Sequence, residues 1–317
     1  MKKKIKTLIT IITPSVEVKN VLSELDSFAD IHFLESNQKL SEYVEDIEVL
    51  YGNIDEENLA RAKNLKWVQT NSTGVEQLMY PAFRNSDVIL TNTGRSICSV
   101  VASHAVTLFL ALARNIHHQR DLMKGHRWEI IVGKDPGNMT LGILGYGKIG
   151  REIAVRVRPF VRQLNILDII KIHETGIIDK AFTLDQLNSF LGECDAIICS
   201  LPLTPDSMNL ISDKEFDSMK TGSYLVNISR GEIVNQDALL KALRSGKLAG
   251  AGIDVLEREP CPPESQLWDE PNLLLTPHSS GYCENLEIRK MQQFVENFKQ
   301  YLNTGKISLS LDKNQGW

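Results

Sequence analysis

The chain has 317 residues, of which 42% are hydrophobic and 24% are charged, and its formal net charge is −5 at pH 7. This length exceeds the size at which one hydrophobic core usually keeps growing, so we expect two domains. The mild negative charge argues against nucleic acid or an anionic membrane as the main partner.

The start of the chain permits two interpretations. Lysines precede the apolar residues 8–12, as in a secretory signal peptide. This stretch is short, rich in threonine and followed by Pro14 without a small-residue cleavage site. We therefore expect a first β-strand there, and we expect no apolar run of membrane-spanning length in the chain.

The cysteines indicate a reducing compartment. Cys98, Cys194, Cys199, Cys261 and Cys283 are odd in number and form no C-x-x-C pair. Disulfide frameworks usually contain an even number of cysteines, so we expect reduced thiols and a cytoplasmic location.

Up to residue 98, short β-branched segments alternate with polar helical stretches. The expected strands are residues 8–12, 31–34, 49–51, 67–70 and 88–91, and the expected helices are residues 16–28, 40–43 and 56–63. This alternation predicts a parallel sheet with helices on its faces. We expect a small flavodoxin-like α/β domain without a glycine-rich nucleotide loop.

A long apolar helix is predicted over residues 99–115. A helix that is apolar around most of its circumference is buried on all sides, in a core or against a second subunit. We interpret it as the bridge between the domains and as a candidate element of a homodimer.

Residues 140–151 contain the most informative motif of the chain. A buried apolar run ends there in G-x-G-x-x-G, formed by Gly145, Gly147 and Gly150, and apolar residues at helical spacing follow. Gly145 allows a tight turn, Gly147 leaves room for a pyrophosphate, and Gly150 lets the helix pack against the strand. The phosphates would meet free N–H groups at the helix N-terminus.

An acid follows at the spacing that a dinucleotide-binding fingerprint requires. Asp168 lies 18 positions after Gly150, at the end of a predicted strand over residues 164–167. A carboxylate there accepts hydrogen bonds from ribose hydroxyls and repels a 2′-phosphate, so it favours NAD over NADP. The alternative is a surface acid after an unrelated glycine turn.

Strands and helices continue to alternate after Asp168. The expected strands are residues 196–201, 223–228, 250–255 and 273–276, and the expected helices are residues 184–191, 213–219 and 237–245. This pattern predicts a Rossmann-type, doubly wound parallel sheet in an NAD-binding domain over residues 99–285. It is inserted into the smaller substrate domain, residues 1–98 and 286–317, to which the amphipathic helix 285–302 returns.

Three successive strand ends of this region deliver chemically useful side chains. They are Arg230, Glu259 and His278, and ligands of doubly wound sheets bind beyond the carboxyl ends of the strands. A histidine can exchange a proton with a substrate oxygen, a carboxylate can orient the histidine, and a guanidinium can bind a carboxylate. Each side chain has a structural alternative, and Glu257 competes with Glu259.

Motifs over nearly the whole chain resemble the D-isomer-specific 2-hydroxyacid dehydrogenase family. They lie at residues 140–151, 201–205, 226–235, 249–260 and 267–278, and upstream at residues 65–75, 88–92 and 110–114. The resemblance implies an oxidoreductase that transfers a hydride between NAD(H) and a small 2-oxo acid or D-2-hydroxy acid. Glyoxylate, hydroxypyruvate and pyruvate are the expected types of substrate.

The resemblance also implies roles for individual residues. His278 would be the catalytic acid and base, Glu259 its carboxylate partner and Arg230 the substrate clamp. The implied cofactor-binding residues are Gly145, Tyr146, Gly147, Lys148, Ile149, Gly150, Asp168, Ser200, Leu201, Pro202, Ile228, Ser229, Arg230, Asp254, His278 and Gly281. The implied substrate-binding residues are Ser72, Thr73, Gly74 and Val75, together with Arg230. Asp254 would bind the nicotinamide carboxamide.

The chain departs from the family pattern at Ser103, where members often carry an acid. Glu259 disfavours the formate dehydrogenase branch, which has glutamine there. An NADH-sensing regulator on the same scaffold is an alternative function, and oxidation of an unusual acid such as phosphite is another. We expect no metal, because the histidines at positions 117, 118 and 126 lack the spacing of ligands.

Overall fold

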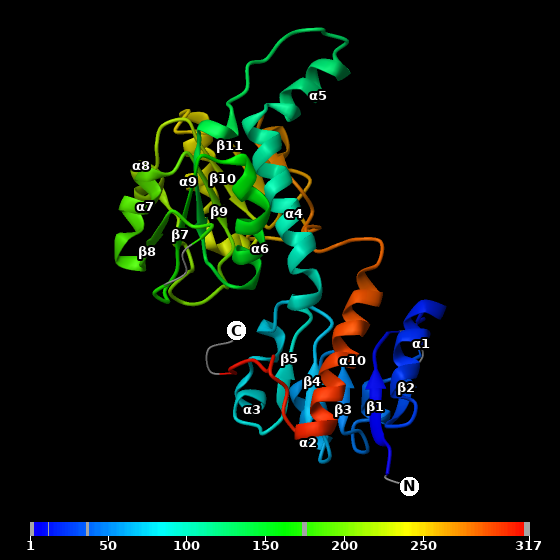
Figure 1. Cartoon of the computed structure of the whole chain (residues 1–317). Helices are drawn as coiled ribbons and strands as arrows, with labels where there is room; N and C mark the ends of the chain where they lie inside the picture. Colours follow the sequence, from blue (N-terminus) through cyan, green and yellow to red (C-terminus); the bar gives the residue numbers. More distant parts are fainter. Residues whose placement is uncertain (1–2, 12, 36–37, 173–175, 314–317) are drawn as a thin grey trace. The chain divides into compact units, whose positions relative to one another are not determined.

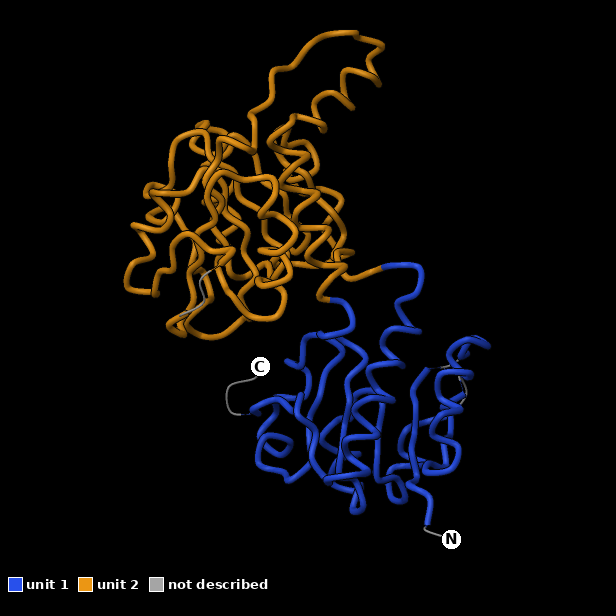
Figure 2. Tube along the Cα trace, in the orientation of Figure 1, with its two compact units in different colours: residues 1–97, 283–317 blue, residues 98–282 orange. Residues whose placement is uncertain are grey.

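The computed structural model of the chain describes residues 3–11, 13–35, 38–172 and 176–313. The chain forms two compact units, which Figure 2 shows in different colours. Unit 1 consists of residues 1–97 and 283–317, and unit 2 consists of residues 98–282.

Unit 1 contains a parallel sheet of five strands in the order β2-β1-β3-β4-β5. The strands are β1 (Ile5–Ile9), β2 (Ala29–Phe33), β3 (Val49–Tyr51), β4 (Trp67–Gln69) and β5 (Ile89–Thr91). This is the strand order of flavodoxin-like folds, so the expected class is confirmed for this unit. The first strand lies earlier than expected, because Ile5–Ile9 pairs with β2; Ile12 falls outside the described residues.

Helices cover both faces of this sheet. They are α1 (Val16–Leu22), α2 (Glu56–Arg61), α3 (Pro81–Arg84), the start of α4 (Gly94–Ala113) and α10 (Leu286–Thr304). Three short 3-10 helices are η1 (Ser23–Leu25), η2 (Leu40–Glu42) and η3 (Glu76–Leu78). The helix expected at residues 40–43 is therefore only a 3-10 turn, and α3 was not anticipated.

Neighbouring residues of a strand face opposite sides of the sheet, and this divides the core of unit 1 in two. Leu8 belongs to one buried cluster with Phe83, whereas Ile9 belongs to the other with Phe294 and Phe298 of α10. Helices α1 and α10 contact each other on this second side (Figure 1). The C-terminal helix thus completes the core of unit 1.

Unit 2 contains a parallel sheet of seven strands in the order β12-β11-β10-β9-β6-β7-β8. The strands are β6 (Thr140–Leu144), β7 (Gln163–Leu167), β8 (Lys180–Phe182), β9 (Ala196–Cys199), β10 (Ser223–Asn227), β11 (Leu248–Ile253) and β12 (Leu273–Leu275). The strand order reverses between β6 and β9, and nucleotides bind at such a switch point. The expected Rossmann-type sheet is confirmed. The short, exposed edge strand β8 was missed.

The helices that complete unit 2 are α5 (Ile116–Lys124), α6 (Lys148–Val157), α7 (Leu187–Glu193), α8 (Asp213–Ser218) and α9 (Gln236–Arg244). Its 3-10 helices are η4 (Pro136–Asn138), η5 (Arg158–Phe160), η6 (Leu184–Gln186), η7 (Gly231–Ile233) and η8 (Gln266–Asp269). The polar stretch after α4 therefore contains a helix, α5, that the sequence pattern did not indicate.

Helix α4 packs against β11 through two glycines. A Cβ on Gly252 would lie 3.0 Å from the Cβ of Leu108, and a Cβ on Gly250 would lie 3.0 Å from Leu112. By length and composition α4 could cross a membrane, so the expectation that no apolar run reaches that length is wrong. Half of the qualifying segment is buried inside the chain, which accounts for its apolar composition.

Within the single chain this helix is not buried on all sides, so the alternative of burial against a second subunit stays a prediction. Ser103 and Thr107 form an exposed stripe on α4. Their hydroxyls donate hydrogen bonds to the carbonyls of Ser99 and Ser103, both at 2.8 Å. The polar atoms on this side are satisfied within the helix and face solvent in the single chain.

Candidate active site

The three glycines after β6 occupy three different environments. Gly145 has φ 95°, a left-handed conformation that favours glycine. A Cβ on Gly150 would lie 2.1 Å from the carbonyl oxygen of Gly145, so the helix and the turn touch there. Apart from Gly147 and its two chain neighbours, no heavy atom of the described residues lies within 4 Å of a Cβ built on Gly147, the N-cap of α6. The turn therefore has the open space and free helix N-terminus that a pyrophosphate requires.

The end of β9 holds this turn in place. Ser200 donates from its backbone N–H to the carbonyl of Leu144 and from Oγ to the carbonyl of Gly145, both at 2.8 Å. Farther along, the carbonyl of Pro202 accepts a hydrogen bond from Ser207 Oγ at 2.7 Å. The guanidinium of Arg151 lies 4.6 Å from the ring centre of the buried Tyr146. Ser200 and Leu201 thus contact the glycine turn at the switch point.

Asp168 lies beside the glycine turn, directly after β7. Its Oδ2 accepts a hydrogen bond from the N–H of Tyr146 at 2.6 Å, and its Oδ1 accepts one from the N–H of Ile170 at 3.0 Å. The carboxylate therefore fixes the turn, a role that the sequence did not indicate, in addition to its place at the expected strand end.

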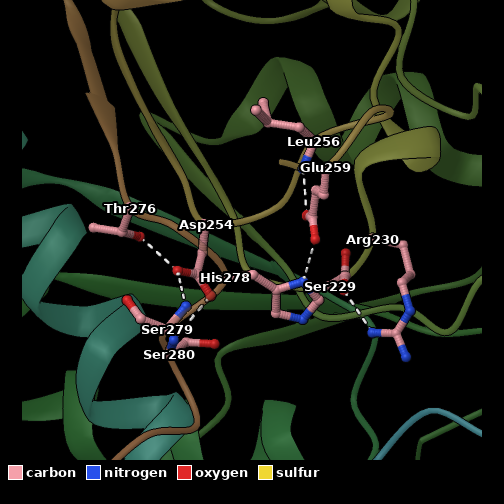
Figure 3. A network of polar contacts seen from close by, with 9 residues as sticks. All are labelled: Ser229, Arg230, Asp254, Leu256, Glu259, Thr276, His278, Ser279 and Ser280. Carbon is pink, nitrogen blue, oxygen red and sulfur yellow. Dashed lines mark hydrogen bonds and ion pairs between the residues drawn. The ribbon is translucent and has the colours of Figure 1, made fainter. Parts of the chain in front are cut away.

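Arg230, Glu259 and His278 follow β10, β11 and β12, which are neighbours in the sheet. Glu259 Oε2 lies 2.7 Å from His278 Nδ1, and Glu259 Oε1 accepts a hydrogen bond from the N–H of Leu256 at 2.9 Å. Glu257 instead accepts a hydrogen bond from the N–H of Gln236 at 3.0 Å. Of the two competing acids, the structure brings Glu259 to the histidine (Figure 3).

The backbone at His278 is unusual. Its φ is 51°, in the left-handed region, and its N–H donates to the carbonyl of Asp254 at 2.8 Å. The fully buried carboxylate of Asp254 accepts hydrogen bonds from the N–H groups of Ser279 at 2.9 Å and Ser280 at 3.0 Å. Asp254 therefore anchors the segment that carries the histidine.

The contact with Glu259 determines which nitrogen of His278 is available. A carboxylate accepts hydrogen bonds, so Nδ1 carries a proton in this pair. Nε2 is consequently the nitrogen that can exchange a proton with a ligand.

The loop of Arg230 packs tightly against the loop of Glu259. A Cβ on Gly231 would lie 1.9 Å from the backbone carbon of Leu256, so no larger residue fits there. The guanidinium of Arg230 donates from Nη1 to the carbonyl of Ser229 at 2.8 Å. Figure 3 shows this hydrogen bond between the guanidinium of Arg230 and the carbonyl of Ser229.

Sequence reasoning missed Asn227, the last residue of β10. It is buried, its Nδ2 donates to the carbonyl of Arg230 at 2.9 Å, and its Oδ1 accepts from Ser229 Oγ at 2.6 Å. An amide at the end of an otherwise apolar strand was the available signal. Asn227 shapes the turn that presents Arg230.

The remaining expected cofactor residues lie around the same strand ends. The N–H of Ile228 donates to the carbonyl of Cys199 at 3.3 Å, and Gly281 follows directly after Ser280. Burial raises the pKa of the Cys199 thiol, and a contact with Ser229 Oγ at 3.3 Å offsets this only partly. Cys199 is therefore a neutral thiol in the core beneath the site.

The expected substrate turn, residues 72–75, belongs to unit 1 and follows β4. Ser72 Oγ donates to the carbonyl of Gly74 at 2.7 Å, and Asn92 Nδ2 donates to the carbonyl of Thr73 at 2.7 Å. Val75 is buried in the core of unit 1. The turn thus has a defined conformation within its own unit.

Together, the fold and the site of unit 2 define a class of protein. A glycine turn at the switch point can hold a dinucleotide, and the adjacent strand ends present a histidine with its carboxylate and an arginine. This combination is that of a nucleotide-dependent dehydrogenase acting on an oxygen-bearing carbon.

Comparison with known proteins identifies the family. Residues 106–280 match the NAD binding domain of D-isomer specific 2-hydroxyacid dehydrogenases. Glyoxylate reductase of Thermofilum pendens is 30% identical over 236 residues, which are 73% of this chain and 70% of the relative. Glyoxylate/hydroxypyruvate reductase B of Pectobacterium carotovorum is 33% identical over 234 residues, which are 72% of each chain.

A solved structure extends the similarity over the full length. The D-isomer specific 2-hydroxyacid dehydrogenase of Xanthobacter autotrophicus Py2, in complex with NADPH and MES, has a TM-score of 0.85 at 23% identity and covers 99% of both chains. The present chain belongs to the D-isomer specific 2-hydroxyacid dehydrogenase family. It is an oxidoreductase with an NAD-binding Rossmann domain, as the sequence motifs implied.

Proposed function

We propose that this enzyme reduces a small 2-oxo acid to the D-2-hydroxy acid with NADH, glyoxylate, hydroxypyruvate or pyruvate being the substrate type. The observation that carries the proposal is the contact of 2.7 Å between His278 and Glu259 at a strand end. Arg230 follows a neighbouring strand, and the relatives named above are glyoxylate and hydroxypyruvate reductases.

Each of the three side chains has a distinct task in this reaction. Bound NADH supplies the hydride for the carbon of the substrate. His278 donates the proton from Nε2 to the substrate oxygen, while Glu259 holds the Nδ1 proton and the orientation of the ring. Arg230 binds the substrate carboxylate as a fork and polarises the oxygen.

The substrate turn of unit 1 is the second element of this proposal. Ser72, Thr73, Gly74 and Val75 are assigned to bind the substrate carboxylate through backbone N–H groups, which a glycine allows to approach closely. The hydrogen bonds that fix the turn within unit 1 support this role.

The cofactor is assigned to the residues that surround the switch point. The N–H groups of residues 145–150 would bind the pyrophosphate, Asp168 the adenosine ribose, and Asp254 the nicotinamide carboxamide. The backbone at Ser200, Leu201, Pro202, Ile228, Ser229 and Gly281 would line the dinucleotide. The open position at Gly147 supports the first assignment.

The function is tested with one substitution and a panel of 2-oxo acids. His278→Ala should abolish the oxidation of NADH by these acids while NADH still binds, because the proton donor is lost. His126→Ala, which alters an exposed histidine, is the control. Persistent turnover in His278→Ala would contradict the assigned role. A wild-type protein that binds NADH tightly but reduces none of the acids would instead indicate an NADH sensor.

The preference for NADH is a separate prediction. Asp168→Asn removes the negative charge that repels a 2′-phosphate but keeps an oxygen that can accept the hydrogen bond from Tyr146. We expect wild-type kcat/KM to be higher with NADH than with NADPH. In the variant this ratio should fall by about tenfold, or about 1.4 kcal/mol, because the charge repulsion is lost. Steady-state kinetics with both cofactors measures this. A wild type that prefers NADPH would contradict the assignment.

We also infer a homodimer. Residues 114–134, called the arm, contain α5 and a segment that extends away from the sheet of unit 2 (Figure 1). The arm exposes five large apolar side chains, and the most exposed are Trp128 at 101%, Ile130 at 93% and Val132 at 86%. Large exposed apolar groups of this kind support an interface, and a second copy related by twofold symmetry presents the same arm. We therefore add the arm to α4 as a candidate dimer element.

A cytoplasmic location completes the proposal. All five cysteines are free thiols in the structure, and three of them are buried. Reduced cysteines are typical of the cytosol. Nucleic acid and membrane are not expected partners of an enzyme with this charge.

A further inference from the structure

His104 is a polar side chain in the mostly apolar part of α4 that belongs to unit 2. Its Nε2 lies 3.0 Å from the hydroxyl of Thr276, and its side chain is 25% exposed. The same nitrogen lies 3.7 Å from Oδ1 of Asp254. His104 therefore reaches the segment that precedes the catalytic histidine.

The hydroxyl of Thr276 determines the direction of this contact. A hydroxyl has one hydrogen, and Thr276 donates it to Asp254 Oδ1 at 2.6 Å. Its oxygen can then only accept a hydrogen bond from His104, so Nε2 of His104 carries a proton. His104 thus donates a hydrogen bond to Thr276, and Thr276 donates one to Asp254.

Asp254 connects Thr276 to the backbone of residues 278–280. Its side chain is fully buried, and its two oxygens accept hydrogen bonds from the hydroxyl of Thr276 and from the N–H groups of Ser279 and Ser280. Its carbonyl accepts the N–H of His278. Figure 3 shows the hydrogen bonds of the Asp254 carboxylate with Thr276, Ser279 and Ser280 on one side of the histidine. They oppose the cost of the left-handed backbone at His278, which non-glycine residues rarely adopt.

We propose that His104 is a positioning residue for His278. By donating to Thr276, it fixes the hydroxyl that in turn orients the Asp254 carboxylate, and it provides a partner for this buried negative charge. The inference rests on the proposed role of His278 and assigns no proton transfer to His104 itself. Partners that orient functional groups in this way typically account for a 10- to 100-fold effect on activity, as an order of magnitude.

The test compares His104→Leu, which removes the donor, with His104→Gln, whose amide nitrogen can occupy the position of Nε2. The first measurement is hydrogen exchange of the backbone amides of residues 278–280, which requires no substrate. We expect faster exchange in His104→Leu and nearly wild-type protection in His104→Gln. His118→Leu is the matched control, because His118 Nε2 contacts Asn272 Oδ1 at 3.1 Å, just before β12.

The second measurement is kinetic. We expect kcat to fall by about 10- to 100-fold in His104→Leu and to recover in His104→Gln. Unchanged exchange and kcat in His104→Leu would overturn the inference, as would equal losses of thermal stability in both variants without a change in kcat. A wild type that reduces no 2-oxo acid would instead overturn the proposed function, so the two failures can be distinguished.

Discussion

Single atoms decide what each glycine of the nucleotide turn contributes. Position 145 requires glycine because its φ is 95°, and position 150 requires glycine because a Cβ would touch the Gly145 carbonyl. Neither reason applies at position 147. Within the described residues nothing fills the space beside Gly147, and its φ of −72° suits any residue. Folding therefore does not require the glycine at 147, which supports the proposed assignment of this position to the pyrophosphate.

This difference predicts opposite effects of two alanine substitutions. Gly147→Ala should change the free energy of unfolding by less than about 0.5 kcal/mol, yet raise the Kd for NADH by about tenfold or more. Gly150→Ala should destabilise the protein by about 1–3 kcal/mol, because its Cβ would overlap a backbone oxygen. Chemical denaturation and NADH titration measure the two quantities. Equal destabilisation by both substitutions would contradict the assignment.

At the scale of elements, the junction of α4 and α5 places two histidines against each other. The ring centres of His117 and His118 lie 4.0 Å apart. Burial, followed by the neighbouring His118, lowers the pKa of His117 from 6.5 to about 4. The unfolded chain therefore binds a proton below about pH 6.5 that the folded chain accepts only near pH 4. The free energy of unfolding therefore does not depend on His117 above about pH 6.5. It decreases as the pH falls from about 6.5 to about 4, because protonation then favours the unfolded chain.

Replacing His117 with phenylalanine should remove this acid sensitivity. Between pH 6.5 and 4, the free energy of unfolding should fall by about 1–2 kcal/mol more in the wild type than in His117→Phe. This value is smaller than the full pKa shift implies, because the ring is only half-buried. Urea denaturation at several pH values measures the difference. His126→Asn, at an exposed position, should behave like the wild type. Parallel pH profiles for His117→Phe and the wild type would show that His117 is not responsible.

At the scale of the whole molecule, the arm is the feature that a single chain does not explain. Its base is closed by two hydrogen bonds, from Lys134 N–H to the carbonyl of Ala113 at 2.7 Å and from Asn115 Nδ2 to the carbonyl of Val132 at 3.0 Å. An arm held at its base, with apolar side chains exposed beyond it, has the form of an element that a partner covers.

We expect the wild type to sediment as a dimer and the combined variant Trp128→Ser, Ile130→Ser, Val132→Ser to sediment as a monomer. The apolar area that drives association is lost, whereas the core of unit 2 is untouched. Val155→Ser with Phe160→Ser removes other exposed apolar groups and should leave the dimer intact. A dimeric triple variant would contradict the proposed interface.

The amino-acid sequence by itself determined the fold class, the glycine turn and the three strand ends. Residues close together in the chain produce the strand and helix periodicity and the spacing from Gly145 to Asp168. These patterns can therefore be recognised without coordinates. Edge strand β8 and helix α5 were not predicted, because short or polar segments show weak hydrophobic periodicity.

Only the tertiary structure decided which of these residues touch. It brought Glu259 and not Glu257 to His278, pressed Gly231 against Leu256, and joined His104 to Asp254 through Thr276. It also turned the apolar side of α4 inward and left the arm exposed. These outcomes depend on contacts between residues far apart in the chain, and only the packing of the sheet and its loops selects among the partners that local sequence allows.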